Sequence, residues 1–341
     1  MQRHLVDISW NALFKVVAFV LALYLISLLR DVLIMLFVVF IFVAAANPAI
    51  QALQARRISR TLAVTLFYVA LAAILLALGL LLVPTLIAQS QELVRALPSI
   101  SARLLNLYAQ HRFAWLSTAL AGITATLNTL PGTAVQTAYG LVGSLAITVT
   151  GIVLSIYLLL EEKSAKEFFH QILPASRYQA VYLTVSKIST RMGAWVRSEL
   201  LLMLIIGVSS LVVYLLFGVP SALALGLWTG LCEAVPVVGP LLGILPALLI
   251  SFSVFGLLKA VGLLIVYTIF IQQFEAHIVV PRVMGKALGL SPVLVILALL
   301  IGSRLFGFIG VLVAVPTAAA VSVIVGEWPS LRRIWETSAD A

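Results

Sequence analysis

Charged residues and cysteine are both scarce in this sequence. Of its 341 residues only 10% are charged, whereas 63% are hydrophobic, and the mean hydropathy is +1.18. A soluble protein of this length cannot hide so much apolar surface, because folding still leaves a large exterior in water. The single cysteine, Cys232, excludes an intrachain disulfide and any metal site built from several cysteines.

Familiar functional motifs are missing as well. The sequence contains no HExxH, no GxSxG and no GxxxxGK[ST], the patterns of zinc proteases, serine hydrolases and phosphate-binding loops. We therefore expect no enzyme, no cofactor and no metal centre. No basic run carries interleaved aromatic residues, which argues against a nucleic-acid partner. The net charge of +9 instead fits Lys and Arg in the cytoplasmic loops of a membrane protein.

Long apolar runs, by contrast, recur from end to end. They are continuous rather than alternating, which predicts an all-α polytopic transmembrane protein of about eight spans in a lipid bilayer. The first two runs, 12–29 and 32–46, are separated only by Arg30 and Asp31. They predict two antiparallel spans joined by a tight turn, with the second span ending at Asn47-Pro48.

Basic residues predict the orientation of the chain. The "RRISR" at 56–60 is expected in the cytoplasm, which places the amino terminus inside as well. A third span in 61–88 completes an N-terminal transmembrane unit over 1–88. Arg332 and Arg333 put the carboxyl terminus inside too, so residues 327–341 are predicted to be a cytoplasmic tail.

The middle of the chain is less apolar. In 89–137, Leu and Ile recur at spacings of three and four, which predicts an external amphipathic helical segment. This segment is either a cap packed on the spans or a helix in the outer headgroup layer. Residues 138–160 predict a span and 161–197 a cytoplasmic amphipathic segment. Glu199 is expected in the first turn of the following helix, where its charge favours the helix dipole.

Residues 198–326 form the predicted transport core, whose helices are broken or re-entrant. The stretch "EAVPVVGPLLGILP", residues 233–246, places Glu233 beside prolines and glycines that interrupt a helix. Irregular backbone at membrane depth is tolerated mainly where it lines a cavity or is packed inside the protein. A carboxylate there usually faces a polar pathway. The segment therefore predicts a substrate or ion site that includes Glu233, Pro236, Gly239 and Pro240. The alternative is a re-entrant hairpin or kinked helix at the membrane boundary, with Glu233 in headgroup water.

A second polar group follows in "YTIFIQQFEAHIVVPRVMGKALGLSP", residues 267–292. Gln272 and Glu275 share a helix face, Gln273 is adjacent, and Arg282 follows. These side chains predict either part of the same pathway or a network that joins two helices. Arg304 either extends to a lipid headgroup or neutralises a buried acid such as Glu233 or Glu275. Gly226 and Gly230 have the spacing of a close helix–helix contact.

These segments together resemble the autoinducer-2 exporter family of bacterial membrane transporters. The similarity runs from about residue 12 to 326 and includes "RRISRTLAV" and "FGVPSALALGLWTGL". Its motifs match this chain at Glu233, Pro236, Gly239, Pro240, Gln273, Glu275, Pro281, Arg282, Gly285, Gly307, Gly310 and Pro316. The resemblance implies a permease of about eight spans in the bacterial inner membrane. Family members resemble either autoinducer-2 exporters or sodium(lithium)/proton antiporters. His277, Ser291 and Arg304 depart from the family pattern.

Three functional hypotheses follow. The first is a secondary transporter that exports a small polar organic solute such as autoinducer-2. The second is a sodium(lithium)/proton antiporter in which Glu233 or Glu275 exchanges protons. The third is a membrane scaffold that transports nothing. The small-residue helix faces are also compatible with a homo-oligomer.

Overall fold

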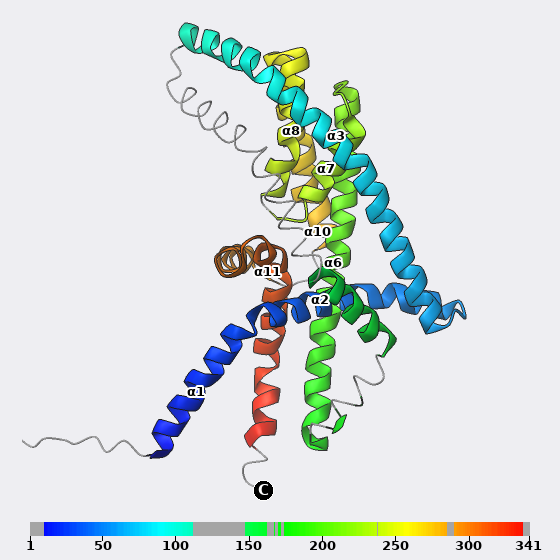
Figure 1. Ribbon diagram of the computed structural model, residues 1–341, viewed down its shortest axis with the longest axis vertical. Coiled ribbons are helices and arrows are strands. Elements are labelled where there is room, and N and C mark those ends of the chain that lie inside the picture. The colour runs from blue at the N-terminus through cyan, green and yellow to red at the C-terminus, as the bar shows by residue number, and fades with distance from the viewer. Residues whose placement is uncertain are drawn as a thin grey trace, which may run out of the picture.

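The computed structural model describes residues 10–111, 147–161, 167, 170–171, 174–236, 238–284 and 290–336. Across these ranges the regular structure is helical throughout, which confirms the all-α polytopic prediction. Five helices are long and apolar enough to cross a bilayer, and four shorter apolar helices accompany them. Figure 1 shows α6 along the centre of the molecule, with α7 and α8 beside its upper half and part of α11 beside its lower half.

The first two helices do not form the predicted hairpin. Helix α1 (Trp10–Leu28) leads into α2 (Arg30–Ala55), and only Leu29 separates them. The Leu29 N–H donates to the Leu25 carbonyl, and the Leu33 N–H donates to the Leu29 carbonyl, so the chain stays helical through the junction. The predicted tight turn was wrong because Arg30 and Asp31 pair with each other at 3.3 Å on an exposed helix surface. Both side chains are thus accommodated on the surface of a continuing helix, without a loop.

Pro48 does not end the second helix either. It lies inside α2, which continues to Ala55. The next helix, α3, runs from Arg60 to His111 without a break. The boundary predicted between residues 88 and 89 thus falls within one helix, and an external location for 89–111 stays a prediction. Residues 112–146 lie outside the described residues, whereas Ile147–Leu160 is a short apolar helix within the predicted span 138–160.

Helix α6 (Ala175–Leu216) is the longest helix in the C-terminal half apart from α11. Its 42 residues correspond to about 63 Å at 1.5 Å per residue, roughly twice the thickness of the hydrocarbon core. The cytoplasmic segment predicted over 161–197 is therefore not separate from the span that follows, because 175–197 forms the first half of this helix. Glu199 lies in the middle of α6, and its predicted place in a first helical turn was wrong.

Helices α7 (Ala222–Cys232) and α8 (Gly239–Phe255) form an antiparallel hairpin. A Cβ atom at Gly243 would lie 3.0 Å from Thr229 Cα, and one at Gly239 would lie 2.2 Å from the Cys232 carbonyl oxygen. The Trp228 Nε1–H donates to the Leu242 carbonyl across the same interface. At 11 and 17 residues the two helices measure about 16 and 26 Å, each less than a bilayer of about 30 Å. The pair therefore has the dimensions of a re-entrant hairpin.

The chain returns through a helix whose hydrogen-bond pattern changes repeatedly. Helix α9 (Leu257–Val266) passes into the π-helix η1 (Tyr267–Gln272), then η2 (Glu275–Val279), and ends as α10 (Val280–Val283). Helix α11 (Pro292–Glu336) follows. It has two arms, because Gly307 has non-helical backbone angles of φ 58° and ψ −136°. The arms cross where a Cβ at Gly302 would lie 2.4 Å from the Gly310 carbonyl oxygen.

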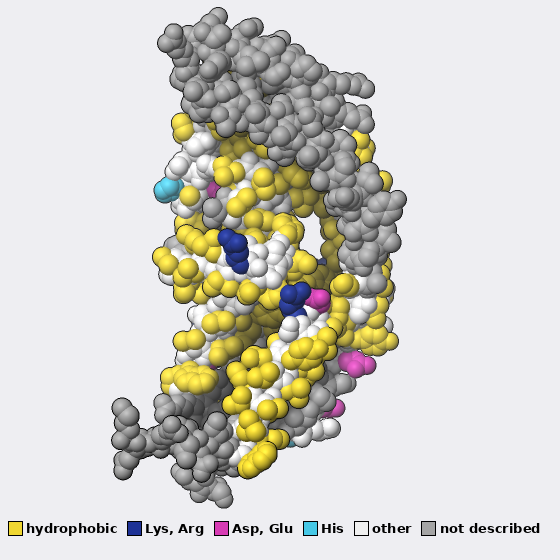
Figure 2. Space-filling view, turned by 60° about the vertical axis from the view of Figure 1, so that its left-hand side comes forward, with side chains coloured by type: hydrophobic (Ala, Val, Ile, Leu, Met, Phe, Trp, Pro, Cys, Tyr) yellow, Lys and Arg dark blue, Asp and Glu magenta, His cyan; other side chains and the backbone are white. Residues whose placement is uncertain are grey.

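Three apolar clusters hold these elements together. The largest joins α6 to α7, α8, α9 and the π-helices. The second joins α2, α3 and Ile147–Leu160, and the third joins α2, α6 and the second arm of α11. Many large apolar side chains nevertheless remain exposed, especially along α1 and α3. Hydrophobic side chains dominate the described surface in Figure 2, as expected of a surface that faces lipid.

Candidate functional site

Glu233 lies at the tip of the α7–α8 hairpin and is nevertheless buried. Its N–H donates to the Thr229 carbonyl, which completes the last turn of α7. The chain then reverses, and the Gly239 N–H donates to the Val235 carbonyl at 2.7 Å where α8 begins. Only 2% of Glu233 is exposed, and its Oε2 atom has no hydrogen-bond partner among the described residues. A re-entrant hairpin was one of the two readings of this segment, but its acid is not in headgroup water.

Glycine and proline account for the geometry of this tip. The side chain of any other residue at Gly239 would collide with the Cys232 carbonyl, so the hairpin can close only around glycine. Pro240 occupies the first turn of α8, where a missing N–H costs no hydrogen bond. Gly239 and Pro240 are both buried, and Pro236 is half-buried in the turn.

Glu275 approaches Glu233 from a separate element. It is the first residue of η2, half-buried, and its carboxyl group is close enough to that of Glu233 to influence it electrostatically. A π-helical turn widens the helix by one residue per hydrogen bond and is common at functional sites. Here π-helical turns lie on both sides of the short link at 273–274 that precedes Glu275. The structure thus brings together two acids that the sequence predicted either in one pathway or, for Glu275, in a network joining two helices.

A third acid, Glu199, completes the group. It is 5% exposed, and neither carboxylate oxygen has a hydrogen-bond partner within the described part of the chain. It interacts electrostatically with Glu275 and with Glu233. Sequence analysis missed it by assigning Glu199 to a helix start. The available signal was the absence of any proline between Ala175 and Leu216, which permits one continuous helix through Glu199.

Buried hydroxyl groups fix the hairpin beside these acids. The Tyr214 hydroxyl of α6 lies 2.9 Å from Thr229 Oγ1 of α7. Thr229 Oγ1 also lies 2.8 Å from the Leu225 carbonyl oxygen and 3.1 Å from that of Gly243. Tyr267 of η1 donates to the Pro240 carbonyl at 3.4 Å. Four elements are therefore tied together by side chains that no sequence motif had indicated.

The other predicted site residues are not gathered at the acids. Gln272 is half-buried, whereas Gln273 and Arg282 are exposed. Arg304 is exposed on the first arm of α11, and within the described residues it forms no ion pair with Glu233 or Glu275. Gly285 lies outside the described residues. No group of three His, Cys, Asp or Glu residues in the described ranges is arranged to hold a metal ion.

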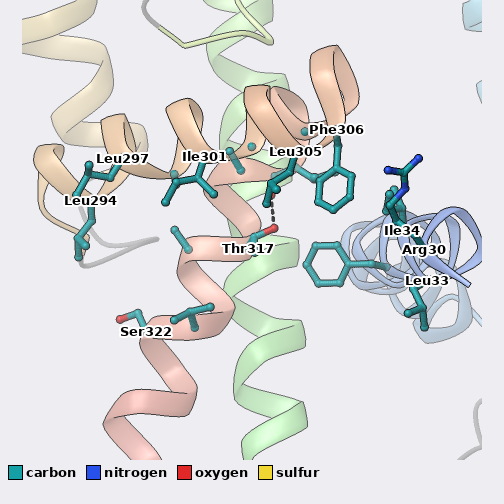
Figure 3. Close-up of a pocket in the computed structure, with 18 of the residues that line it drawn as sticks. Arg30, Leu33, Ile34, Leu294, Leu297, Ile301, Leu305, Phe306, Thr317 and Ser322 are labelled. Atoms are coloured by element: carbon teal, nitrogen blue, oxygen red, sulfur yellow. Dashed lines mark hydrogen bonds between the residues drawn. The ribbon is translucent and has the colours of Figure 1, made fainter. Parts of the chain in front are cut away.

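A large apolar cavity lies elsewhere, between the junction of α1 and α2 and the two arms of α11. It has a volume of about 860 Å³. In Figure 3, Leu294, Leu297, Ile301 and Phe306 of the first arm face it from one side and Leu33 and Ile34 of α2 from another. The Thr317 hydroxyl donates to the Val313 carbonyl, so this polar side chain is already satisfied. Glu233 and Glu275 do not line this cavity.

Comparison with known proteins decides the family. The model of the AI-2E family transporters matches residues 13–330, nearly the whole chain. The chain belongs to the AI-2E transporter family. It is therefore a multi-pass membrane transporter, and the resemblance found in the sequence is confirmed. The three carboxylates described above lie within the part of the chain that the family model covers.

Named relatives agree with this assignment. The AI-2E chain is 30% identical over 295 residues to YueF of Bacillus subtilis, named as a transport protein, covering 81% of this chain and 78% of YueF. It is 24% identical to PerM of Escherichia coli K12, named as a permease, over 81% of this chain and 82% of PerM. A shorter match to YrrI of Bacillus subtilis is 41% identical but covers 39% of this chain and 37% of YrrI.

Proposed function

We propose that this AI-2E transporter exports a small polar organic solute, with autoinducer-2 as the named candidate, and exchanges protons at Glu233 and Glu275. The observation that carries this proposal is the proximity of two carboxyl groups, one buried at the tip of a hairpin too short to cross the bilayer and the other on η2. Broken helices with acids at their ends are a recurrent way to build transporter sites.

The chemistry of the acid pair supports proton exchange. An ionised carboxylate buried without a partner is costly, so it is stabilised by a proton, a cation or a polar solute. Glu233 and Glu275 repel each other when both are ionised, and one proton between them removes that repulsion. A solute that bears hydroxyl groups supplies donors to the carboxylates once that proton has left. Binding of the solute and of the proton would therefore compete, as coupled transport requires.

Flux into proteoliposomes tests this proposal. Purified protein should move labelled autoinducer-2 in response to a pH gradient, and Glu275→Gln should reduce that flux at least tenfold. Glu161→Gln is the matched control, since Glu161 is an exposed acid at the end of Ile147–Leu160. Flux in the Glu275→Gln protein equal to that of the wild type would remove Glu275 from the mechanism.

A sodium(lithium)/proton antiporter is the second candidate, favoured by the chemistry of the same pair. Carboxylate oxygens are suitable ligands for hard cations. With the two carboxyl groups of this pair as ligands, the remaining ligands of such a cation would be main-chain carbonyls and water. Addition of sodium or lithium to everted vesicles should then dissipate a pH gradient reported by a dye. Loss of that response in Glu233→Gln, with no flux of labelled autoinducer-2 in the wild type, would favour the antiporter.

Location and assembly complete the proposal. We place the protein in the bacterial inner membrane with both termini in the cytoplasm, because Arg56 and Arg57 lie between α2 and α3 and Arg60 begins α3. Fusion of a cytoplasm-specific reporter to each terminus checks this orientation. The extensive exposed apolar surface of α1 is consistent with a homo-oligomer as well as with lipid contact. Cross-linking in native membranes shows whether this surface contacts a second copy of the chain or lipid.

A further inference from the structure

Glu199 is a buried acid for which the fold offers no structural partner. It lies on α6, the helix that contacts α2, α7, α11 and the π-helical segment. Both of its carboxylate oxygens are inaccessible and lack hydrogen-bond partners among the described residues. The neighbouring Ser198 hydroxyl, by contrast, donates to the Val283 carbonyl at 3.0 Å and thereby joins α6 to α10. Glu199 is therefore enclosed at a packed junction without contributing a bond to it.

The register of α6 against α7 places Glu199 close to Glu233. A Cβ at Gly230 would lie 2.6 Å from the Met203 carbonyl oxygen, and one at Gly207 would lie 3.2 Å from that of Gly226. Gly230 also approaches Gly207, and Gly226 also approaches Leu211, so this antiparallel pairing places Glu233 opposite residues 200–204, about one turn from Glu199. Glu275 interacts with both Glu199 and Glu233. Three acids from three elements thus lie close enough beside the hairpin tip to influence one another electrostatically.

No basic side chain on the described elements around α6 neutralises Glu199. Arg197 extends toward the Ala44 and Ala45 carbonyls of α2, and Lys187 pairs with Glu327 of α11. Arg282 of α10 and His277 of η2 are exposed, and His277 Nδ1 lies 3.2 Å from the Gln273 carbonyl oxygen. Tyr214, Tyr267 and Cys232, near Glu233, bear no positive charge. Among the described residues, the charged groups that influence or are influenced by Glu199 are therefore Glu275 and Glu233.

We propose that Glu199 is a third proton-carrying carboxyl group of the transport site, sharing protons with Glu233 and Glu275. The inference rests on the proposed proton exchange at that pair. Burying an unpaired carboxylate at this depth costs far more free energy than burying a neutral carboxylic acid. The enclosed carboxyl group of Glu199 is therefore suited to carry a proton. In each transfer one carboxyl O–H bond breaks and one forms on the receiving carboxylate, directly or across a bridging water. No electron is transferred.

This arrangement has a consequence for coupling. With two acids, the hairpin tip and the π-helical segment share a proton between them. With Glu199, the same proton can also reside on α6, the helix that packs against α2 and the second arm of α11. The protonation state of the site then affects helices on both sides of α6.

Infrared difference spectroscopy tests the proposal without reference to any transported solute. The full-length protein in lipid bilayers is compared between about pH 6 and pH 10, a range in which ordinary exposed carboxyl groups, which titrate near pH 4.3, stay ionised. The wild type should lose a protonated-carboxyl C=O band as the pH rises. Glu199→Gln should remove a distinct part of that band, while Glu161→Gln leaves it unchanged. Glu199→Asp should keep a carboxyl band at a shifted frequency.

The outcomes separate this inference from the proposed function. A Glu199→Gln spectrum identical to that of the wild type, in protein with an unchanged thermal transition, overturns the inference while leaving flux through Glu233 and Glu275 intact. Absence of solute flux in the wild type, with the Glu199 band present, refutes the proposed solute instead.

Discussion

The Nη1 atom of Arg197 lies 3.5 Å from the carbonyl oxygen of Ala44, whose usual helical donor is missing because residue 48 is proline. The same atom lies 3.5 Å from the Ala45 carbonyl oxygen. Gly193 permits this approach, since a Cβ there would lie 2.3 Å from the Ala44 oxygen. Helix α6 thereby supplies the hydrogen bonding that allows α2 to continue through Pro48.

Arg197→Met should therefore destabilise the protein by about 1–2 kcal/mol, because a buried carbonyl loses a charged donor. The measurement is thermal or denaturant unfolding followed by tryptophan fluorescence in detergent. Pro48→Ala is the matched variant, since it restores the N–H that Ala44 lacks. In the Pro48→Ala background the loss of Arg197 should cost less. Equal costs in both backgrounds would show that Arg197 does not compensate for the proline.

The contact between α6 and α7 depends on Gly230. Replacement by alanine places a Cβ 2.6 Å from the Met203 carbonyl oxygen and 3.0 Å from Gly207 Cα, so the helices must separate. We expect Gly230→Ala to lower stability by about 1–3 kcal/mol and to reduce solute flux, because the Glu199–Glu233 register depends on this contact. Gly79→Ala is the control: nothing lies within 4 Å of its Cβ, and stability should rise by about 0.5–1 kcal/mol. Similar losses in both variants would contradict this packing.

The two arms of α11 require Gly307. Its φ of 58° combined with ψ of −136° is unfavourable for any residue with a side chain. Gly307→Ala should cost about 1–3 kcal/mol and increase proteolysis near the bend. Gly326→Ala, at an open position of the same helix, should be neutral or slightly stabilising. A protease pattern for Gly307→Ala that matches the wild type would argue against the bend.

Thr229 joins three helices through one hydroxyl group. Thr229→Val keeps the shape but leaves the Tyr214 hydroxyl without its acceptor, and should cost about 1–3 kcal/mol. Tyr214→Phe removes the donor alone and leaves Thr229 bonded to main-chain carbonyls, so it should cost less. The double variant should be less destabilised than the sum of the two single changes. Additive losses would mean that the two hydroxyls act independently.

Some features of the site were accessible from residue pattern alone. Pro236, Gly239 and Pro240 cannot continue an ordinary helix, so an interruption beside Glu233 follows from backbone chemistry. The Gly226/Gly230 contact was likewise predicted and is confirmed against Gly207 and Met203 of α6. The hydroxyl group of Thr229 was not predicted, because an isolated threonine in an apolar helix carries no positional signal.

Two local predictions of helix breaks failed. Arg30-Asp31 and Asn47-Pro48 were expected to interrupt helices, yet the helical backbone passes through both. The charged pair remains exposed on its helix, and Arg197 approaches the carbonyl that Pro48 leaves open. At Pro48, whether the break signal ends the helix thus depends on a partner distant in the sequence.

Composition and backbone chemistry alone determined that this chain is a helical membrane protein with interrupted segments near its acids. Apolar surface must face lipid, and proline and glycine act on their own immediate neighbours. The meeting of Glu199, Glu233 and Glu275 was decided only by the tertiary structure. Their proximity depends on glycine contacts and π-helical turns that align three separate elements, and hydropathy contains no information on that alignment.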